Sequence, residues 1–138
     1  MLGLDFDEGT TLIVRLQQCY EIVLEEYRAA YGRNWQNTTV LFPGIAELLK
    51  SLTEQQIPIG VLSNKAHDFT LKCVEAFLGD WEWSVILGAR DGIPKKPDPA
   101  GAVEAAASMG VDLGNIWYLG DSDVDMFTAK NSGMHAVG

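Results

Sequence analysis

The chain has 138 residues, of which 10 are Lys or Arg and 19 are Asp or Glu, so its formal net charge is −9. With 47% hydrophobic and 21% charged residues, it has the composition of a globular domain with its own core and not of a disordered segment. The excess of acidic residues argues against nucleic acid and against an anionic membrane as the main partner.

The N-terminal part of the chain contains two predicted helices separated by a break. Apolar side chains recur with helical spacing from about Leu12 to Tyr31, and Gly32 is expected to end this helix. Pro43-Gly44 then interrupts the pattern, and residues 45–52 are predicted to form the second helix.

From Ile57 onward, strands and helices are predicted to alternate. Buried strands are expected over residues 57–62, 85–87, 116–119 and 134–137, and helices over 69–78, 99–110 and 124–131. This alternation indicates right-handed βαβ units and a parallel sheet, and therefore an α/β fold. Trp117 lies within the third strand, so we expect its side chain to belong to the core.

The first polar group at a strand end is Ser63-Asn64, which follows the strand predicted over residues 57–62. The hydroxyl of Ser63 could donate to a phosphate oxygen, helped by the backbone N–H groups of the turn that follows. The alternative is that the Ser-Asn pair only caps that turn.

The second group is the basic segment Lys95-Lys96-Pro97-Asp98-Pro99. The two prolines restrict the backbone around Lys96, which suits a site that needs a positioned cation. The alternative is a solvated basic loop before a helix that begins at Asp98-Pro99.

The third group is the acidic turn Gly120-Asp121-Ser122-Asp123-Val124-Asp125, directly after the strand over residues 116–119. Open α/β sheets bind their ligands at the carboxyl ends of the strands. Asp121 and Asp125 could converge on one Mg²⁺ ion, which prefers one or two carboxylates together with water and phosphate oxygens. The alternative is a helix start with a polar cap and acids in its first turn.

Taken in order, these segments resemble the later motifs of the haloacid dehalogenase-like hydrolase superfamily, and in particular its phosphoglycolate phosphatase-like members. The matching segments are Pro43-Gly44-Ile45, Leu62-Ser63-Asn64-Lys65, Lys96-Pro97-Asp98-Pro99, Gly120-Asp121-Ser122-Asp123-Val124-Asp125-Met126, Thr128-Ala129-Lys130 and Gly133-Met134. The resemblance implies a Rossmann-like, three-layer parallel sheet in residues 41–138. Residues 1–40 would then be the remnant of a helical cap or an inserted N-terminal helix.

The resemblance also implies an activity, namely Mg²⁺-dependent hydrolysis of a small phosphorylated metabolite such as phosphoglycolate through an aspartyl-phosphate. Asp121 would bind the metal, and Asp125 would be a second ligand or an outer-sphere partner. Ser63 and Asn64 would bind the substrate. Lys96 would offset the repulsion between the nucleophile and the phosphate, where each like-charge pair costs about 4 kcal/mol at about 4 Å and an effective dielectric constant of about 20.

The family's nucleophile lies in an Asp-x-Asp-Gly-Thr motif after a buried strand, and residues 2–10 resemble this motif with Glu8 inserted. Asp5 and Asp7 are therefore candidate catalytic residues. The alternative is that they belong to a loop before the first helix, in which case the chain is a truncated member without its nucleophile. If residues 2–6 do not form the central strand, we expect the chain to be unstable or inactive, because the strands ending at Ser63 and Leu119 lose their common neighbour.

Two further function classes remain open. A phosphoacceptor domain of the response-regulator type also combines acids, a Ser or Thr and a Lys, but there the paired acids come first in the chain and the Lys last. A pseudophosphatase that binds a phosphorylated ligand without hydrolysing it would keep all three polar groups.

The cysteines and the N-terminus indicate where the protein works. Cys19 and Cys73 have neither the close spacing of a metal site nor an evident disulfide partner, and this favours a reduced compartment. No basic segment followed by an apolar core is present at the N-terminus, and no apolar run is long enough to cross a bilayer. We therefore expect a cytoplasmic protein without a membrane partner.

Overall fold

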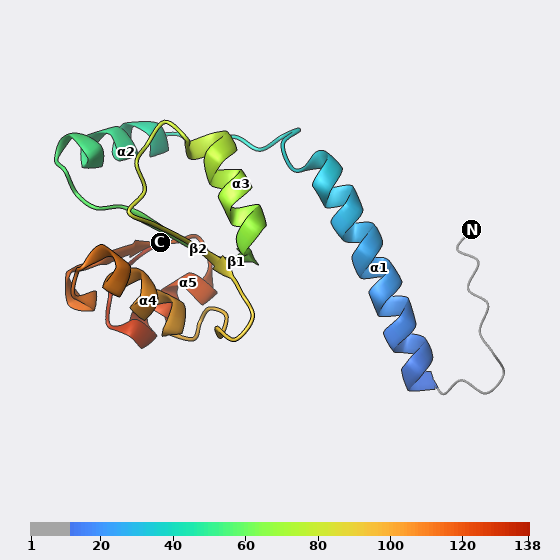
Figure 1. Cartoon of the computed structure of the whole chain (residues 1–138). Helices are drawn as coiled ribbons and strands as arrows, with labels where there is room; N and C mark the ends of the chain where they lie inside the picture. Colours follow the sequence, from blue (N-terminus) through green and yellow to red (C-terminus); the bar gives the residue numbers. More distant parts are fainter. Residues whose placement is uncertain (1–11) are drawn as a thin grey trace. The chain divides into compact units, whose positions relative to one another are not determined.

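The computed structural model describes residues 12–138 and divides the chain into two compact units, Met1–Val40 and Leu41–Gly138. The described part of the first unit is one long helix, α1 (Leu12–Asn34), which is followed by a turn (Figure 1). The prediction that Gly32 ends this helix is wrong. Gly32 does not adopt the left-handed backbone that terminates a helix, and α1 continues for two more residues. None of the described helices has the length and apolar character that crossing a bilayer requires.

The second unit contains alternating helices and strands from residue 45 to its end. They are α2 (Ile45–Glu54), β1 (Gly60–Ala66), α3 (His67–Leu78), β2 (Val85–Ala89), α4 (Ala100–Met109), a short 3₁₀ turn (Leu113–Asn115), β3 (Trp117–Leu119), α5 (Asp123–Ser132) and β4 (His135–Val137). The two helices that end in a left-handed glycine, α4 and α5, stop at Gly110 and Gly133.

Strand β1 begins later than the sequence predicts. The predicted start at Ile57 is wrong because Pro58 has no N–H and the N–H of Ile57 donates to the carbonyl of Leu52, 3.0 Å away. The strand runs on to Ala66, with an irregular register after Leu62. Ser63 and Asn64 therefore lie in the last part of the strand and not after it.

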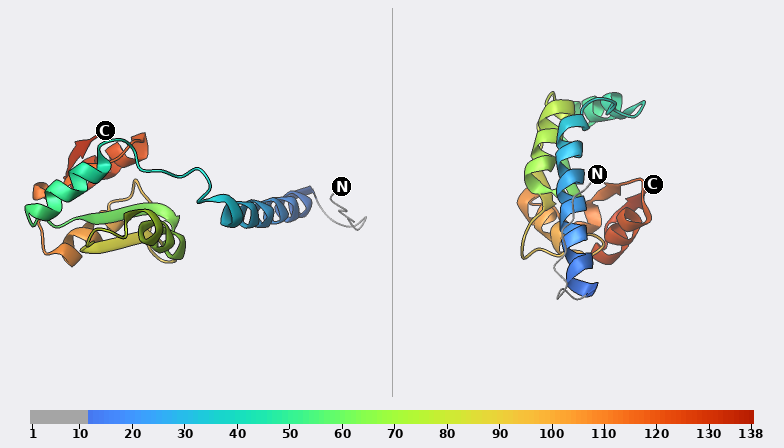
Figure 2. Two further views of the ribbon diagram at one scale, coloured as in Figure 1. Left: turned by 90° about the horizontal axis from the view of Figure 1, so that it is seen from above. Right: turned by 90° about the vertical axis from the view of Figure 1, so that its right-hand side faces the viewer.

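Within residues 12–138, the strands form two parallel pairs. Strand β1 pairs with β2, with Gly60 opposite Val85, and β3 pairs with β4, with Trp117 opposite His135 (Figures 1 and 2). No backbone hydrogen bond joins β1 to β3 in the described part of the chain. The parallel strands expected from the sequence are present, and among residues 12–138 no strand lies between β1 and β3.

The core lies where α4 and α5 pack against the strands. Figure 1 shows α3 on one face of the β1–β2 pair and α4 on the other. Ala102 and Ala129 are fully buried, and the partly buried Leu62, Ile116 and Tyr118 pack around them. The largest fully buried side chain among the described residues is only that of Thr128. Leu49, Val74, Leu87 and Met134 are also buried, so the core of the second unit combines alanines with larger apolar side chains.

Trp117 is not a core residue, so that prediction is wrong. Its side chain is 71% exposed, and its ring stacks on the ring of His135 with 4.9 Å between the centroids. The physical reason is that β3 is paired on one side only among the described strands, so few described residues cover its side chains.

Candidate active site

The side chain of Asn64 ties the end of β1 to the loop that carries Lys96. Its Nδ2 donates to the carbonyl of Lys96 at 3.0 Å, and its Oδ1 accepts from the N–H of Lys96 at 2.9 Å. Both sides of one amide thus hold the backbone of a single residue that lies far away in sequence. Because of this double contact, the position of Lys96 is set from β1 as well as from the two prolines that follow it.

The ammonium group of Lys96 donates to three acceptors on three different segments. Its Nζ lies 2.7 Å from Oδ1 of Asp125, 3.1 Å from the carbonyl oxygen of Leu62 and 3.2 Å from the hydroxyl of Tyr118. The Lys96 and Asp125 side chains are only 12% and 10% exposed. A lysine has three N–H donors, so all of them are used inside the protein.

These contacts determine the charge state of the cluster. Burial alone would lower the pKa of Lys96, but the hydrogen bonds to Asp125 and Tyr118 outweigh it, and the pKa is raised. Burial alone would raise the pKa of Asp125, yet the bonds from Lys96 and Ser122 lower it. Burial raises the pKa of Tyr118. At neutral pH the cluster is therefore an ammonium, a carboxylate and a neutral phenol.

Asp125 also forms the start of α5. The Oγ of Ser122 accepts from the N–H of Asp125 at 3.3 Å, while the N–H of Ser122 donates back to Oδ2 of Asp125 at 3.3 Å. This reciprocal pair is a capping box. The Ser122 hydroxyl additionally donates to the same Oδ2 at 2.5 Å. The alternative that the acidic turn is a capped helix start is thus correct for Asp125. Both of its carboxylate oxygens accept hydrogen bonds.

Gly120 is required for this arrangement because no side chain fits between it and Asp125. A Cβ atom added at Gly120 would lie 2.8 Å from Oδ2 of Asp125 and closer still to its Cβ and Cγ atoms. The backbone at the end of β3 can therefore approach the carboxylate closely only with glycine at this position.

Ser63 makes one local hydrogen bond and still has a hydrogen-bond donor to offer. Its Oγ accepts from the N–H of Lys65 at 3.1 Å, within the irregular last part of β1. A hydroxyl that accepts one bond keeps its own proton for another acceptor. Ser63 lies next to Leu62, whose carbonyl binds Lys96, so the hydroxyl and the ammonium belong to the same strand end.

Asp121 and Asp123 are both exposed, and the Asp121 carboxylate has no hydrogen bond or ion pair with the described residues. No group of three His, Cys, Asp or Glu side chains that could hold a metal occurs among the described residues. A Mg²⁺ ion needs only one or two carboxylates, with water and phosphate as its other ligands. Asp121 can supply one such carboxylate. Asp125 could bind the same ion directly only by losing its hydrogen bond from Lys96 or those from Ser122. As an outer-sphere partner of the ion, it would keep these bonds.

The structure thus brings Ser63, Asn64, Lys96 and Asp125 together through bonds between β1, the Lys96 loop and α5, with Asp121 at the end of β3. Asn64 holds Lys96 with the carbonyl oxygen and one N–H of its side-chain amide, which leaves the second N–H for a ligand. Asp5 and Asp7 lie outside the described residues. Sequence reasoning missed Tyr118, because a tyrosine in an apolar strand gives no signal of what its hydroxyl contacts.

The sequence model of the haloacid dehalogenase-like hydrolase family matches residues 4–138. The phosphoglycolate phosphatase of Escherichia coli (strain K12) is 33% identical over 108 residues, which are 78% of this chain and 43% of the relative. The phosphoglycolate phosphatase of Pectobacterium atrosepticum is 30% identical over 83% of this chain and 49% of the relative. The chain therefore spans about half the length of the curated relatives it matches.

Solved structures agree with the sequence match. A candidate phosphoglycolate phosphatase from Lactobacillus delbrueckii subsp. bulgaricus superposes with a TM-score of 0.79 and 32% identity, covering 96% of this chain and 53% of the other. A predicted phosphoglycolate phosphatase from Haemophilus somnus superposes with a TM-score of 0.76 and 30% identity, covering 83% of this chain and 51% of the other. The Rossmann-like α/β fold expected from the sequence is thus confirmed, and the chain belongs to the haloacid dehalogenase-like hydrolase family.

Proposed function

We propose that this chain carries the phosphate-binding and metal-binding half of a Mg²⁺-dependent phosphatase that hydrolyses a small phosphate monoester through an aspartyl-phosphate. The observation that supports the proposal most strongly is the position of Lys96. Its ammonium is held against the end of β1 and against the start of α5, with side-chain exposure of 12%. A chain with a net charge of −9 needs such a local cation to attract a phosphorylated ligand.

The described residues would act on the phosphate in separate ways. The Ser63 hydroxyl donates its free proton to one phosphate oxygen. The Lys96 ammonium turns from Leu62 or Tyr118 toward the phosphate while Asp125 keeps it protonated and in place. Tyr118 positions the lysine, and Asn64 holds the lysine backbone while its remaining N–H is available to the substrate. A preorganised donor of this kind stabilises the charge that develops in the transition state without any reorganisation at that moment.

In the proposed reaction, an aspartate carboxylate attacks phosphorus, and the alkoxide leaves and takes up a proton. Water then attacks the aspartyl-phosphate and releases inorganic phosphate together with the free carboxylate. Asp5 is the candidate for this nucleophile, and Asp7 is the candidate to protonate the leaving group. Bound Mg²⁺ would neutralise charge on the transferring phosphoryl group, with Asp121 as its ligand from this chain.

The substrate class follows from the relatives. The curated relatives are phosphoglycolate phosphatases, so a small organophosphate with a second anionic group is the substrate to test first. Phosphoglycolate carries two anionic groups, and a single cation such as Lys96 balances only part of that charge. The metal and further donors would have to balance the remainder.

The experiment is to measure phosphate release from phosphoglycolate and from p-nitrophenyl phosphate by the full chain, with Mg²⁺ and with EDTA. We expect Mg²⁺-dependent turnover that Asp5→Asn and Asp121→Asn reduce at least a hundredfold, while the matched variant Asp123→Asn retains it. Turnover that survives both EDTA and Asp121→Asn would contradict the proposal. Binding of inorganic phosphate without any turnover would instead identify a pseudophosphatase.

A further inference from the structure

An ion pair between Arg90 and Glu104 closes the base of the segment that carries Lys96. Arg90 directly follows β2 and Glu104 lies in α4, so the pair joins the two ends of residues 90–104, here called the Lys96 segment. Nη1 of Arg90 lies 2.9 Å from Oε1 of Glu104, and Nη2 lies 2.6 Å from Oε2. Two parallel bonds between a planar guanidinium and a carboxylate fix the direction of both side chains.

The guanidinium group of Arg90 depends on Glu104 for its orientation. Its Nε atom is buried and has no hydrogen-bond partner among residues 12–138. The hydrogen bonds within the pair raise the pKa of Arg90 and lower the pKa of Glu104, so both groups are charged at neutral pH. A lysine in place of Arg90 would keep the charge but could not form the bidentate contact.

The pair fixes geometry more than it stabilises the fold. The side chains of Arg90 and Glu104 are 30% and 36% exposed, whereas those of Lys96 and Asp125 are 12% and 10% exposed. Water screens ion pairs that it reaches, so such pairs contribute much less to the free energy of unfolding than buried ones. The main effect of the Arg90–Glu104 pair is therefore to hold the two ends of the Lys96 segment together.

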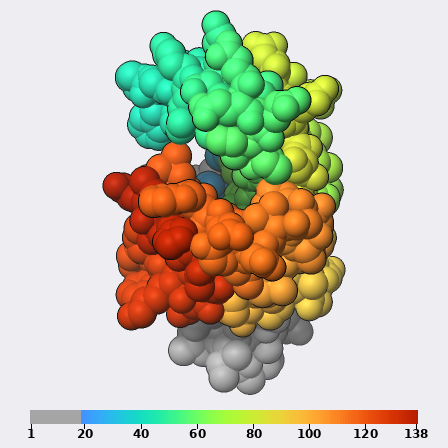
Figure 3. Space-filling model, turned by 90° about the vertical axis from the view of Figure 1, so that its left-hand side faces the viewer, coloured from blue at the N-terminus to red at the C-terminus, as the bar shows by residue number. Residues whose placement is uncertain are grey.

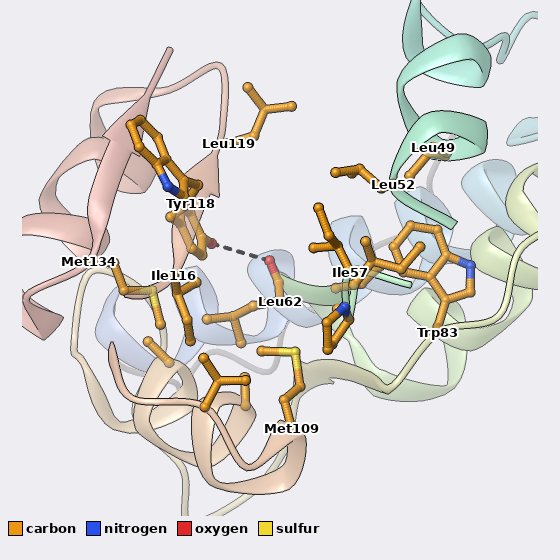
Figure 4. A pocket seen from close by; sticks show the side chains of 18 of the residues that line it. Leu49, Leu52, Ile57, Leu62, Trp83, Met109, Ile116, Tyr118, Leu119 and Met134 are labelled. Carbon is orange, nitrogen blue, oxygen red and sulfur yellow. Dashed lines mark hydrogen bonds between the residues drawn. The ribbon is translucent and has the colours of Figure 1, made fainter. Parts of the chain in front are cut away.

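Lys96 needs such support because its ammonium must change acceptors when a phosphate binds. The ammonium binds the Leu62 carbonyl and the Tyr118 hydroxyl, which lie 3.4 Å apart in an apolar groove between β1 and β3 (Figure 4). Figure 3 shows this hollow between α2 and the β3–β4 part of the second unit. Apolar side chains line most of the groove, so it gives a moving ammonium little support. The backbone of Lys96 has to be held from elsewhere.

Arg90 also packs against the candidate phosphate site itself. Ser63, Asn64, Arg90 and Lys96 are among the residues that line one small cavity of about 10 Å³. This volume has room for about one water molecule, so a shift of any lining side chain changes the contacts of the others. Arg90 is thus connected to the site through packing as well as through the chain.

We propose that Arg90 is a positioning residue for Lys96 and that Glu104 holds Arg90 in the conformation that this role requires. The pair fixes the base of the Lys96 segment, and Asn64 fixes the backbone of Lys96 itself. Asn131 of α5 donates to the carbonyl of the residue after Lys96 at 2.9 Å. The ammonium can then exchange one acceptor for a phosphate oxygen while its backbone stays in place. The role in phosphate binding rests on the proposed function, and neither Arg90 nor Glu104 touches the phosphate.

Hydrogen exchange of the full, ¹⁵N-labelled chain tests the positioning without any ligand. The N–H of Lys96 donates to Asn64 and reports on the segment, while the N–H of Ala129 in α5 reports on unfolding of the whole unit. We expect Arg90→Lys to speed exchange at Lys96 at least tenfold and to leave exchange at Ala129 unchanged. Unchanged exchange at Lys96 would overturn the proposal. Equal acceleration at both amides would also overturn it, because the pair would then only stabilise the fold.

Calorimetric binding of inorganic phosphate with Mg²⁺ tests the consequence for the site. Arg90→Lys should weaken binding at least fivefold, because a loosely held lysine no longer meets the phosphate at the required distance. The control Glu54→Gln removes the exposed Lys50–Glu54 pair of α2 and should leave the affinity unchanged. Equal affinity in Arg90→Lys and the parent chain would contradict the positioning role. A parent chain that binds no phosphate would contradict the proposed function instead, and the exchange at Lys96 would still decide this inference.

Discussion

The Nζ atom of Lys96 lies 2.7 Å from Oδ1 of Asp125, and this ion pair joins the loop after β2 to the start of α5. Each partner is almost completely shielded from water and has further hydrogen bonds that hold its geometry. The pair therefore connects the two parallel strand pairs of the second unit at the candidate active site. Its energy and its response to pH can be tested without any substrate.

Removing one partner of this pair should destabilise the fold strongly. Lys96→Met leaves a buried carboxylate without its cation, a change that costs about 3–5 kcal/mol in other proteins. We expect a large fall in the urea midpoint, followed by far-UV circular dichroism. The double variant Lys96→Met/Asp125→Leu should recover part of the loss, since no charge is then left unpaired. A single variant as stable as the parent chain would show that the pair contributes little.

The contribution of the Lys96–Asp125 pair to the free energy of unfolding should be constant around neutral pH and disappear at very low and very high pH. Asp125 has a lowered pKa, so its stabilisation is complete above the unfolded value of about 3.9 and is lost as pH falls through the folded value. Lys96 has a raised pKa, so its stabilisation is complete below about pH 10 and is lost as pH rises through the folded value. The measurement is the difference in unfolding free energy between the parent chain and the double variant. A difference that varies strongly between about pH 5 and pH 9 would disagree with these shifts.

Gly120→Ala should disrupt the same cluster through the backbone. The new methyl group would overlap Asp125, so β3 and α5 must separate and the contact with Lys96 must lengthen. We expect a clear loss of thermal stability. Gly114→Ala is the control, because a Cβ at Gly114 meets nothing within 4 Å. Equal melting temperatures for the two variants would mean that the close approach at Gly120 is not needed.

The chain as a whole should unfold with a weak or poorly cooperative transition. Among the described residues of its second unit, the largest fully buried side chain is only that of Thr128, and an apolar groove lies between β1 and β3. Differential scanning calorimetry of the purified chain measures this directly. A sharp two-state transition with a stability of several kcal/mol would indicate that some segment fills the groove.

The sequence predicted the local elements well because each is encoded by neighbouring residues. The helical spacing of apolar residues predicted the bounds of α2, α3, α4 and α5 to within a few residues, and short apolar runs predicted where the strands lie. Trp117 was misassigned because the pattern of a strand does not reveal whether both of its edges are paired. Gly32 was misassigned because a glycine ends a helix only when its backbone becomes left-handed.

The candidate site could be predicted only in part. Ser63, Lys96 and Asp121 stand at strand ends, which sequence order and topology together indicate. The bonds that assemble them could not be read from the sequence, because Asn64 and Lys96 are 32 residues apart, and Lys96 and Asp125 are 29 apart. The same holds for Tyr118, whose hydroxyl lies 3.2 Å from Lys96 Nζ although the two residues are 22 apart in the sequence.

The most direct test of the central claim is the binding of inorganic phosphate to the full chain, measured by calorimetry in the presence of Mg²⁺. Because this test needs no nucleophile, it isolates the role of the ammonium group. We predict that Lys96→Met weakens phosphate binding at least tenfold in the variant fraction that remains folded, while the neighbouring Lys95→Met leaves it unchanged. Equal phosphate affinity in the parent chain and in both variants would contradict the assignment of Lys96 to the phosphate site.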